Sequence, residues 1–155
     1  SIRGDIAKVF VNCGEAGMPV ILQSLYSTDV ATQRMAVGAL GLAGGVAVSH
    51  LIAMLEQPHF FPGIQQDIAA ALGGAGRLAG AAVLPLCRLL QDSQIWVRFE
   101  AATAIETIAD NCDGMVPGAT QAVAALQDLM GDCDAWVRVA AVNALAAFGS
   151  LAIGV

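Results

Sequence analysis

The sequence predicts an all-α fold, an α-solenoid of stacked antiparallel helix pairs, on three observations. The chain of 155 residues is 57% hydrophobic and 13% charged, and it has 17 glycines but only 5% aromatic residues. This composition is typical of helices that pack closely through small side chains. Apolar residues recur at three- and four-residue spacing, which indicates amphipathic helices. The third observation is an internal repeat, the usual mark of a solenoid.

The repeat is clearest in two segments, 90–98 and 130–138. In each, an aspartate stands six residues before an arginine that follows Trp-Val. Weaker copies align at positions 3, 33 and 65. One helix pair cannot bury both its faces, whereas stacked pairs share a continuous core. We therefore expect a single domain over residues 1–155 with about four and a half repeats: a half repeat at 1–16 and repeats at approximately 17–44, 45–76, 77–113 and 114–150.

The first helix of each pair is an apolar stretch that ends at a short polar turn. Pro19 and Pro117 suit the opening turns of two of them, because the first N–H groups of a helix have no partner in the helix. The glycine pair 44–45 separates one first helix from the helix before it. The predicted first helices are 18–27, 46–57, 82–91 and 118–131.

The second helices follow those turns. Asp29 and Asp134 stand where an N-cap is needed, since a short side-chain oxygen accepts a backbone N–H that the helix leaves free. Glycines at 73–74 end another second helix. The predicted second helices are 2–13, 30–43, 62–74, 94–110 and 134–149.

Both ends of the chain lack a polar capping surface. The chain opens directly in a second helix and closes on the apolar segment 149–155. Because the end repeats of a solenoid need a polar outer face, we expect the chain to be a segment of a longer solenoid, or its ends to be covered by a partner or by a second copy.

The repeat motif resembles the HEAT-repeat family, particularly the short HEAT-like repeats of phycobilisome lyases. The motif is Asp-x5-Arg, present as Asp92 to Arg98 and as Asp132 to Arg138. The resemblance implies that these four side chains bond to the backbone and to the adjacent repeat, and so form a structural ladder. The sequence departs from the family at positions 33 and 65, where glutamine replaces the arginine.

The concave face of such a stack is the first candidate for partner binding. If second helices line it, residues one, five and eight places after the arginine position point into the groove. Many of them are small, such as Gly38, Gly41, Ala70 and Gly73, which either admits a partner helix or only lets neighbouring helices pack tightly. The candidate contact residues are Lys8, Arg34, Gln66, Phe99, Thr103, Glu106 and Asn143.

Aromatic residues give two further candidates. Phe60 and Phe61 lie in a proline-flanked loop and are either tucked under a neighbouring element or exposed as a contact patch. Trp96 and Trp136 occupy equivalent repeat positions, and Phe61 aligns with them. An aromatic row could anchor a partner, but we expect these side chains to fill the core between the two helices of each pair.

The charge of the chain argues against several partners. A net charge of -6 with seven Lys and Arg excludes the basic surface that nucleic acid or an anionic membrane requires. The stretch 92–134 is acidic and could dock a basic partner, although a solvated face explains it more simply. Residues 35–55 carry no formal charge, but the stretch divides at its glycine pair, so we expect no membrane span.

The sequence offers no catalytic residue, cofactor site or metal site. His50 and His59 have no histidine or cysteine at ligand spacing, and the four cysteines are expected to be reduced and buried. Residues 74–79 match G-x-G-x-x-A, a motif that binds dinucleotides only after a strand, whereas here a helical pattern precedes it. No secretory signal is visible, so we expect a cytoplasmic location.

The predicted function is therefore a non-enzymatic scaffold or adaptor that binds a protein partner through its concave helix face or its apolar ends. Fold alone does not decide function. The resemblance leaves one alternative, a phycobilin-lyase-type or chaperone-like subunit acting on a cofactor-bearing protein.

Overall fold

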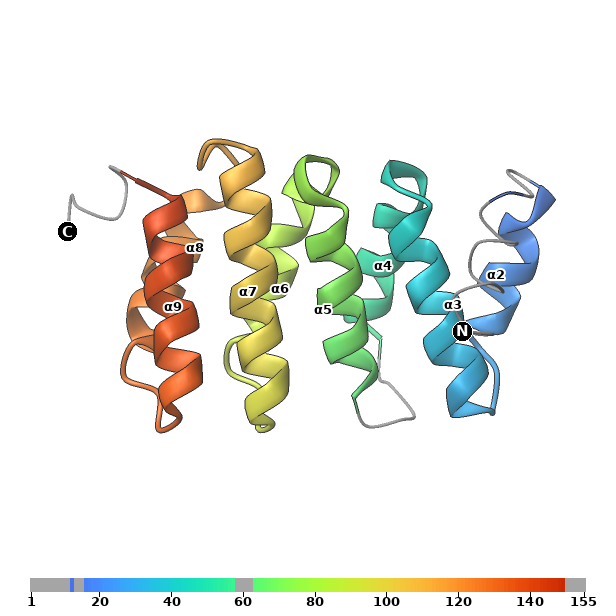
Figure 1. Cartoon of the computed structure of the whole chain (residues 1–155), viewed down its shortest axis with the longest axis horizontal. Helices are drawn as coiled ribbons and strands as arrows, with labels where there is room; N and C mark the ends of the chain where they lie inside the picture. Colours follow the sequence, from blue (N-terminus) through green and yellow to red (C-terminus); the bar gives the residue numbers. More distant parts are fainter. Residues whose placement is uncertain (1–11, 13–15, 58–62, 150–155) are drawn as a thin grey trace.

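The helices form two layers along one row, and the row runs the length of the molecule (Figure 1). The computed structural model describes residues 12, 16–57 and 63–149, and it contains helices and no strand in those ranges. The first helices are α2 (Met18–Ser24), α4 (Gly45–Leu55), α6 (Val83–Leu89) and α8 (Ala119–Leu129). The second helices are α3 (Val30–Leu42), α5 (Ile64–Gly74), α7 (Ile95–Asn111) and α9 (Ala135–Ala147). The predicted α-solenoid of antiparallel pairs is confirmed.

Local sequence signals set most helix boundaries. Asp29 caps α3 by accepting the backbone N–H of Thr32 at 2.8 Å, and Asp134 caps α9 in the same way. Gly44, with a φ of 71°, separates α3 from α4 in a conformation that other residues rarely adopt. Pro117 does not open a helix as expected, because α8 begins only after Gly118. A 3-10 helix, η2 (Gly76–Ala82), precedes α6 and was not predicted.

The hydrophobic core lies between the two layers and continues from pair to pair. Fully buried side chains come from both first and second helices. Burying one such side chain stabilises the fold by roughly 1.5–3 kcal/mol, so the shared core supplies most of the stability of each pair. The largest of these residues are Leu40, Leu51, Ile64, Ile68, Leu72, Leu86, Ile105, Ile108 and Leu126.

The second helices pack directly on one another, while the first helices touch each other much less. Small residues allow the closer approach: a Cβ on Gly41 would lie 2.9 Å from the Cβ of Ala71, and one on Gly73 would lie 3.1 Å from the Cα of Ala104. A row of pairs that is tighter on one side curves toward that side. The second helices therefore line the concave face.

The fold bears on two features of the sequence, the G-x-G-x-x-A segment and the uncharged stretch 35–55. The G-x-G-x-x-A segment 74–79 begins at the last residue of α5 and continues into η2, so a helix and not a strand precedes it. Among the helices of the described residues, none combines the length and the hydropathy needed to cross a membrane.

Candidate partner-binding surface

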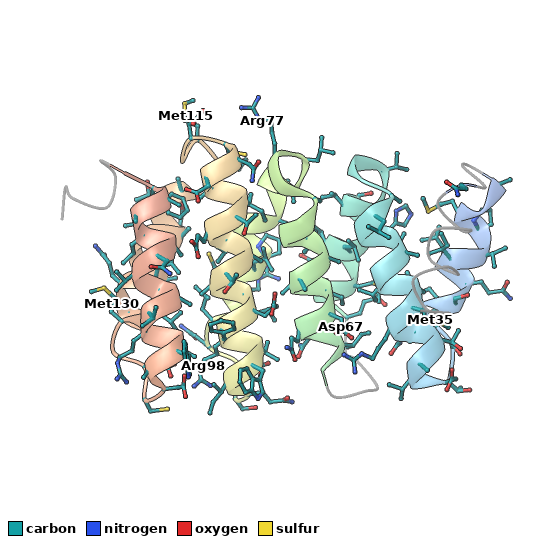
Figure 2. All side chains as sticks on the ribbon, viewed as in Figure 1. Met35, Asp67, Arg77, Arg98, Met115 and Met130 are labelled. Carbon is teal, nitrogen blue, oxygen red and sulfur yellow. The ribbon has the colours of Figure 1, made fainter. Side chains whose placement is uncertain are left out.

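A groove of about 890 Å³ lies on the concave face between α3 and α5. Several of its lining residues, Arg34, Gly38, Gly41 and Ala70, occupy the positions expected to face the concave surface. Figure 2 labels Met35 and Asp67, which line the groove from α3 and α5. A Cβ at Gly38 would meet no atom within 4 Å, so this part of the groove is open space.

An ion pair crosses the groove. Arg34 Nε donates to Asp67 Oδ2 at 2.6 Å, and its Nη2 donates to Oδ1 at 3.0 Å. The hydrogen bond to Asp67 raises the pKa of Arg34 above its usual value. The pair neutralises the one basic side chain that the concave face was expected to offer among the described residues. The sequence analysis did not predict this pairing because Asp67 stands two residues after position 65, the arginine position of its repeat, and the family motif specifies no residue there.

Trp96 and Trp136 stand seven residues before Thr103 and Asn143, so helical spacing puts them on the side of α7 and α9 that carries the predicted concave positions. Trp96 is 61% exposed and Trp136 is 67% exposed, and Trp96 packs edge-on against Phe99 with ring centroids 6.4 Å apart. The expectation that the tryptophans fill the core is wrong. The next residue in each helix, Val97 or Val137, takes the core position instead, and adjacent residues on a helix point about 100° apart.

The same face of α7 is acidic. Glu100 is half-buried and has no ion-pair partner among the described side chains. Its burial and the negative charge of Asp67 raise its pKa. Burial and the charge of Asp110 likewise raise the pKa of Glu106. This face therefore favours a positively charged partner group, which agrees with the alternative considered for the acidic stretch.

One ladder rung joins the last two helix pairs of the described stack. Arg98 is 8% exposed, and its Nε and Nη2 donate to the two carboxylate oxygens of Asp132 at 2.7 and 3.0 Å. Its Nη1 donates to the backbone oxygens of Asp92 and Ser93. The hydrogen bond from Arg98 lowers the pKa of Asp132. Figure 2 shows Arg98 between the lower ends of α7 and α9.

The other residues of the ladder motif form local bonds. Asp92 accepts the backbone N–H of Gln94 within its own turn at 2.8 Å. Arg138 donates to the backbone oxygens of Asp132 and Cys133. Gln33, which replaces an arginine, is buried and donates to the oxygen of Leu25 at 2.8 Å, while its Oε1 has no partner among the described residues.

The remaining candidates are scattered. Gln66 and Thr103 are half-buried, and the Thr103 hydroxyl donates to its own helix at the Phe99 oxygen. Asn143 is exposed on α9, outside the groove between α3 and α5. Lys8, Phe60 and Phe61 lie outside the described residues.

The cysteines are less buried than expected. Cys87 and Cys112 are half-buried, and Cys133 is exposed; Cys13 lies outside the described residues. Burial raises the pKa of Cys87 to about 11, which keeps this thiol protonated and unreactive at neutral pH. In the part of the chain that the structure describes, no three His, Cys, Asp or Glu side chains gather closely enough to hold a metal ion.

The fold and its surfaces define an α-solenoid repeat protein. Residues 83–153 match the family model of HEAT repeats. No curated protein is significantly similar to the chain.

Two solved structures share the fold. A crystal structure of an engineered protein is 24% identical, with a TM-score of 0.64, and the match covers 88% of this chain and 64% of that one. The complex of CpcE and CpcF of phycocyanin lyase from Nostoc sp. PCC7120 is 18% identical, with a TM-score of 0.69, and the match covers 89% of this chain and 85% of that one. The chain thus spans less than two thirds of the engineered protein, and both matches show the same helical fold over most of this sequence.

Proposed function

We propose that the chain is a non-enzymatic scaffold that binds an extended or helical segment of a partner protein on its concave face. The observation that carries the proposal is the exposure of Trp96 and Trp136 on that face, where Trp96 packs against the half-buried ring of Phe99. Exposing a large aromatic side chain forfeits the free energy that its burial would give, and tryptophan is among the residues that most often dominate binding energy.

The charges of the face favour a particular kind of segment. Glu100 lies four residues after Trp96 on α7, and Glu106 lies seven residues after Phe99. Residues three, four and seven apart share one side of a helix, so both carboxylates lie on the side of α7 that carries these two rings. Arg34 is already paired with Asp67. A segment with lysine or arginine beside an apolar residue would therefore meet both the aromatic rings and the free carboxylates, and cation–π contact would add to the attraction.

The two tryptophans are the only ones in the sequence, so intrinsic fluorescence reports directly on this face. The experiment selects peptides that bind the full chain from a displayed random library, and then measures their binding by tryptophan emission and by anisotropy. We expect the selected peptides to carry basic residues, to shift the emission, and to bind the Trp96→Ala/Trp136→Ala variant at least about tenfold more weakly.

A matched control is Tyr26→Ala, which removes an aromatic side chain of similar exposure, 68%, from the turn after α2. It should leave the affinity unchanged. Selection of no peptide, or of peptides that bind the double tryptophan variant as tightly as the wild type, would refute the proposal.

The second candidate is a lyase-type or chaperone-like subunit that acts on a cofactor-bearing protein. It is supported by the likeness to the CpcE and CpcF complex, a likeness in fold. Titrating the purified chain with a bilin and recording the visible absorbance tests it: a saturable spectral change is expected for this candidate, and an unchanged spectrum would exclude bilin handling.

A further inference from the structure

Two neighbouring contacts between second helices have the same register. Between α3 and α5, a Cβ on Gly41 would lie 2.9 Å from the Cβ of Ala71. Between α5 and α7, a Cβ on Gly73 would lie 3.1 Å from the Cα of Ala104. In both contacts the glycine stands eight residues after the arginine position of its repeat, and the alanine stands six residues after that of the next repeat. Equivalent repeat positions therefore meet each other in the two contacts.

The ion pair between α3 and α5 shows what the next contact lacks. Arg34 stands one residue after the arginine position of its repeat, and Asp67 stands two residues after that of the next repeat. Two hydrogen bonds of 2.6 and 3.0 Å join them. In the contact between α5 and α7, the same two places hold Gln66 and Glu100. The carboxylate is thus retained one repeat later, while an uncharged amide replaces the guanidinium.

The carboxylate of Glu100 is not neutralised by a neighbour. Glu100 is half-buried, and no ion pair of the described residues includes it. Burial and the negative charge of Asp67 raise its pKa, which is the effect of a partly desolvated carboxylate with another carboxylate nearby. A guanidinium beside Glu100 would remove this unfavourable burial of charge, because buried charges are stabilised by pairing.

An aromatic side chain adjoins the place where the guanidinium is missing. Trp96 stands one turn before Glu100 on α7, and residues four apart share one side of a helix. Its indole is exposed and packs edge-on against Phe99. A guanidinium stacks on aromatic rings and is more weakly hydrated than an ammonium group. The surroundings of Glu100 therefore favour arginine over lysine.

We propose that Glu100 determines the specificity of the concave face by binding the guanidinium of one arginine of the partner segment, in the place where Arg34 binds Asp67 one repeat earlier. The inference rests on the proposed binding of a segment to this face, and it names the side chain that the segment must carry. A further repeat at either end of the stack would not cover this place, because α5 and α7 belong to the second and third of the four described helix pairs.

A second copy of this chain is a poor source of the guanidinium. Among the described residues, Arg34, Arg88 and Arg98 are paired with carboxylates of their own chain. Arg77 and Arg138 donate to backbone oxygens of their own chain. Two copies with a net charge of -6 each also repel one another. Charge complementarity therefore favours an arginine from a partner of different sequence.

The substitution Gln66→Arg supplies the missing guanidinium from within the chain. We expect it to pair with Glu100 as Arg34 pairs with Asp67, so that the pKa of Glu100, followed by NMR of its carboxyl carbon, falls below the wild-type value. The matched control Gln121→Arg adds the same charge at an exposed position of α8, in the other layer, and should leave this pKa unchanged. An unchanged pKa in Gln66→Arg would overturn the proposal.

The binding probe is N-acetyl-argininamide, and N-acetyl-citrullinamide, which has the same shape without the charge, is the comparison. The arginine probe should shift the NMR signals of the Glu100 carboxyl carbon and the Trp96 indole N–H to saturation. The citrulline probe should bind at least about tenfold more weakly, and Gln66→Arg and Glu100→Gln should each weaken binding of the arginine probe as much. Gln121→Arg should bind it like the wild type. No saturable shift, equal binding of the two probes, or undiminished binding to Gln66→Arg would overturn the proposal.

Both measurements are made without a partner segment, so they test this inference separately from the selection of peptides. Selected peptides that depend on the tryptophans but bind Glu100→Gln as tightly as the wild type would overturn the inference and leave the proposed function intact. A chain that dimerises by light scattering and becomes monomeric as Glu100→Gln would also overturn it, since the arginine would then come from a second copy.

Discussion

The change Arg98→Met tests whether the buried ladder rung stabilises the stack. The methionine keeps much of the aliphatic stem but removes two bonds to Asp132 and two to the turn oxygens. Asp132 would keep only local donors, with its side chain 9% exposed. Removing one partner of a buried ion pair costs about 3–5 kcal/mol. Because Asp132 retains the backbone N–H of Asp134, we expect a loss near the lower limit, about 3 kcal/mol.

The matched control is Arg138→Met, at the equivalent position of the next repeat. Arg138 is exposed and bonds only to its own turn, so its loss should cost less than about 1 kcal/mol. Urea unfolding followed by circular dichroism measures both. If the two variants lose the same stability, the burial and geometry of the Arg98 pair do not contribute as argued.

The same rung has a pH dependence. The pKa of Asp132 is lowered in the folded chain, mainly by Arg98, so the pair stabilises the fold fully above the unfolded pKa of about 3.9. This contribution is lost as the pH falls through the lower folded pKa. The stability difference between the wild type and Arg98→Met should therefore be constant near neutral pH and shrink below about pH 4. A difference that stays constant down to the acid transition would contradict the reasoning.

Three further outcomes are expected. Gly41→Ala should destabilise the chain by about 1–3 kcal/mol, because its Cβ would overlap Ala71. Gly38→Ala in the same helix meets open space and should stabilise the chain by about 0.5–1 kcal/mol. Thermal melts that rank the two variants in the opposite order would disprove the packing argument. Asp134→Ala removes the cap of α9 and should cost about 0.5–2 kcal/mol in urea unfolding, with no change meaning that the cap is redundant. Burial and Asp67 raise the pKa of Glu100, which means that the ionised carboxylate destabilises the fold at pH 7. Glu100→Gln should therefore stabilise the chain at pH 7, and this gain should fade as the pH falls and Glu100 becomes protonated. A gain in stability that does not depend on pH would point to another cause.

Much of the fold could be predicted because each helix pair carries its own signals. Asp29 and Asp134 are caps in the structure as in the prediction, and the glycines at 44–45 and 73–74 stand at helix ends. The 3-10 helix at 76–82 was missed because its alanines and glycines have no periodicity that separates it from a connecting loop. Helix existence follows from local pattern, while irregular connections depend on how neighbouring pairs dock.

The candidate surface was predicted less well, for a geometric reason. Helical spacing correctly placed Arg34 and Ala70 at the groove, because that depends only on the register of each helix. It could not say that Asp67 of the next repeat reaches Arg34, which depends on the offset between helices. The tryptophans lie outside the core because Val97 and Val137, the next residue of each helix, occupy the core position, and the repeat pattern alone does not distinguish these two neighbouring positions.

The unequal ladder implies an unfolding order along the stack. The buried Arg98 pair joins α7 and α9, whereas in α3 the same position holds Gln33, whose Oε1 has no partner among the described residues. In a linear array each pair is stabilised only by its neighbours, so local opening should begin near α2 and α3 and reach α7 last. The groove beside α3 then lies in the part of the stack that opens most easily, and it can adjust its shape to an incoming segment. The tryptophans of α7 and α9 lie in the more stable part, so we expect their arrangement to change little on binding.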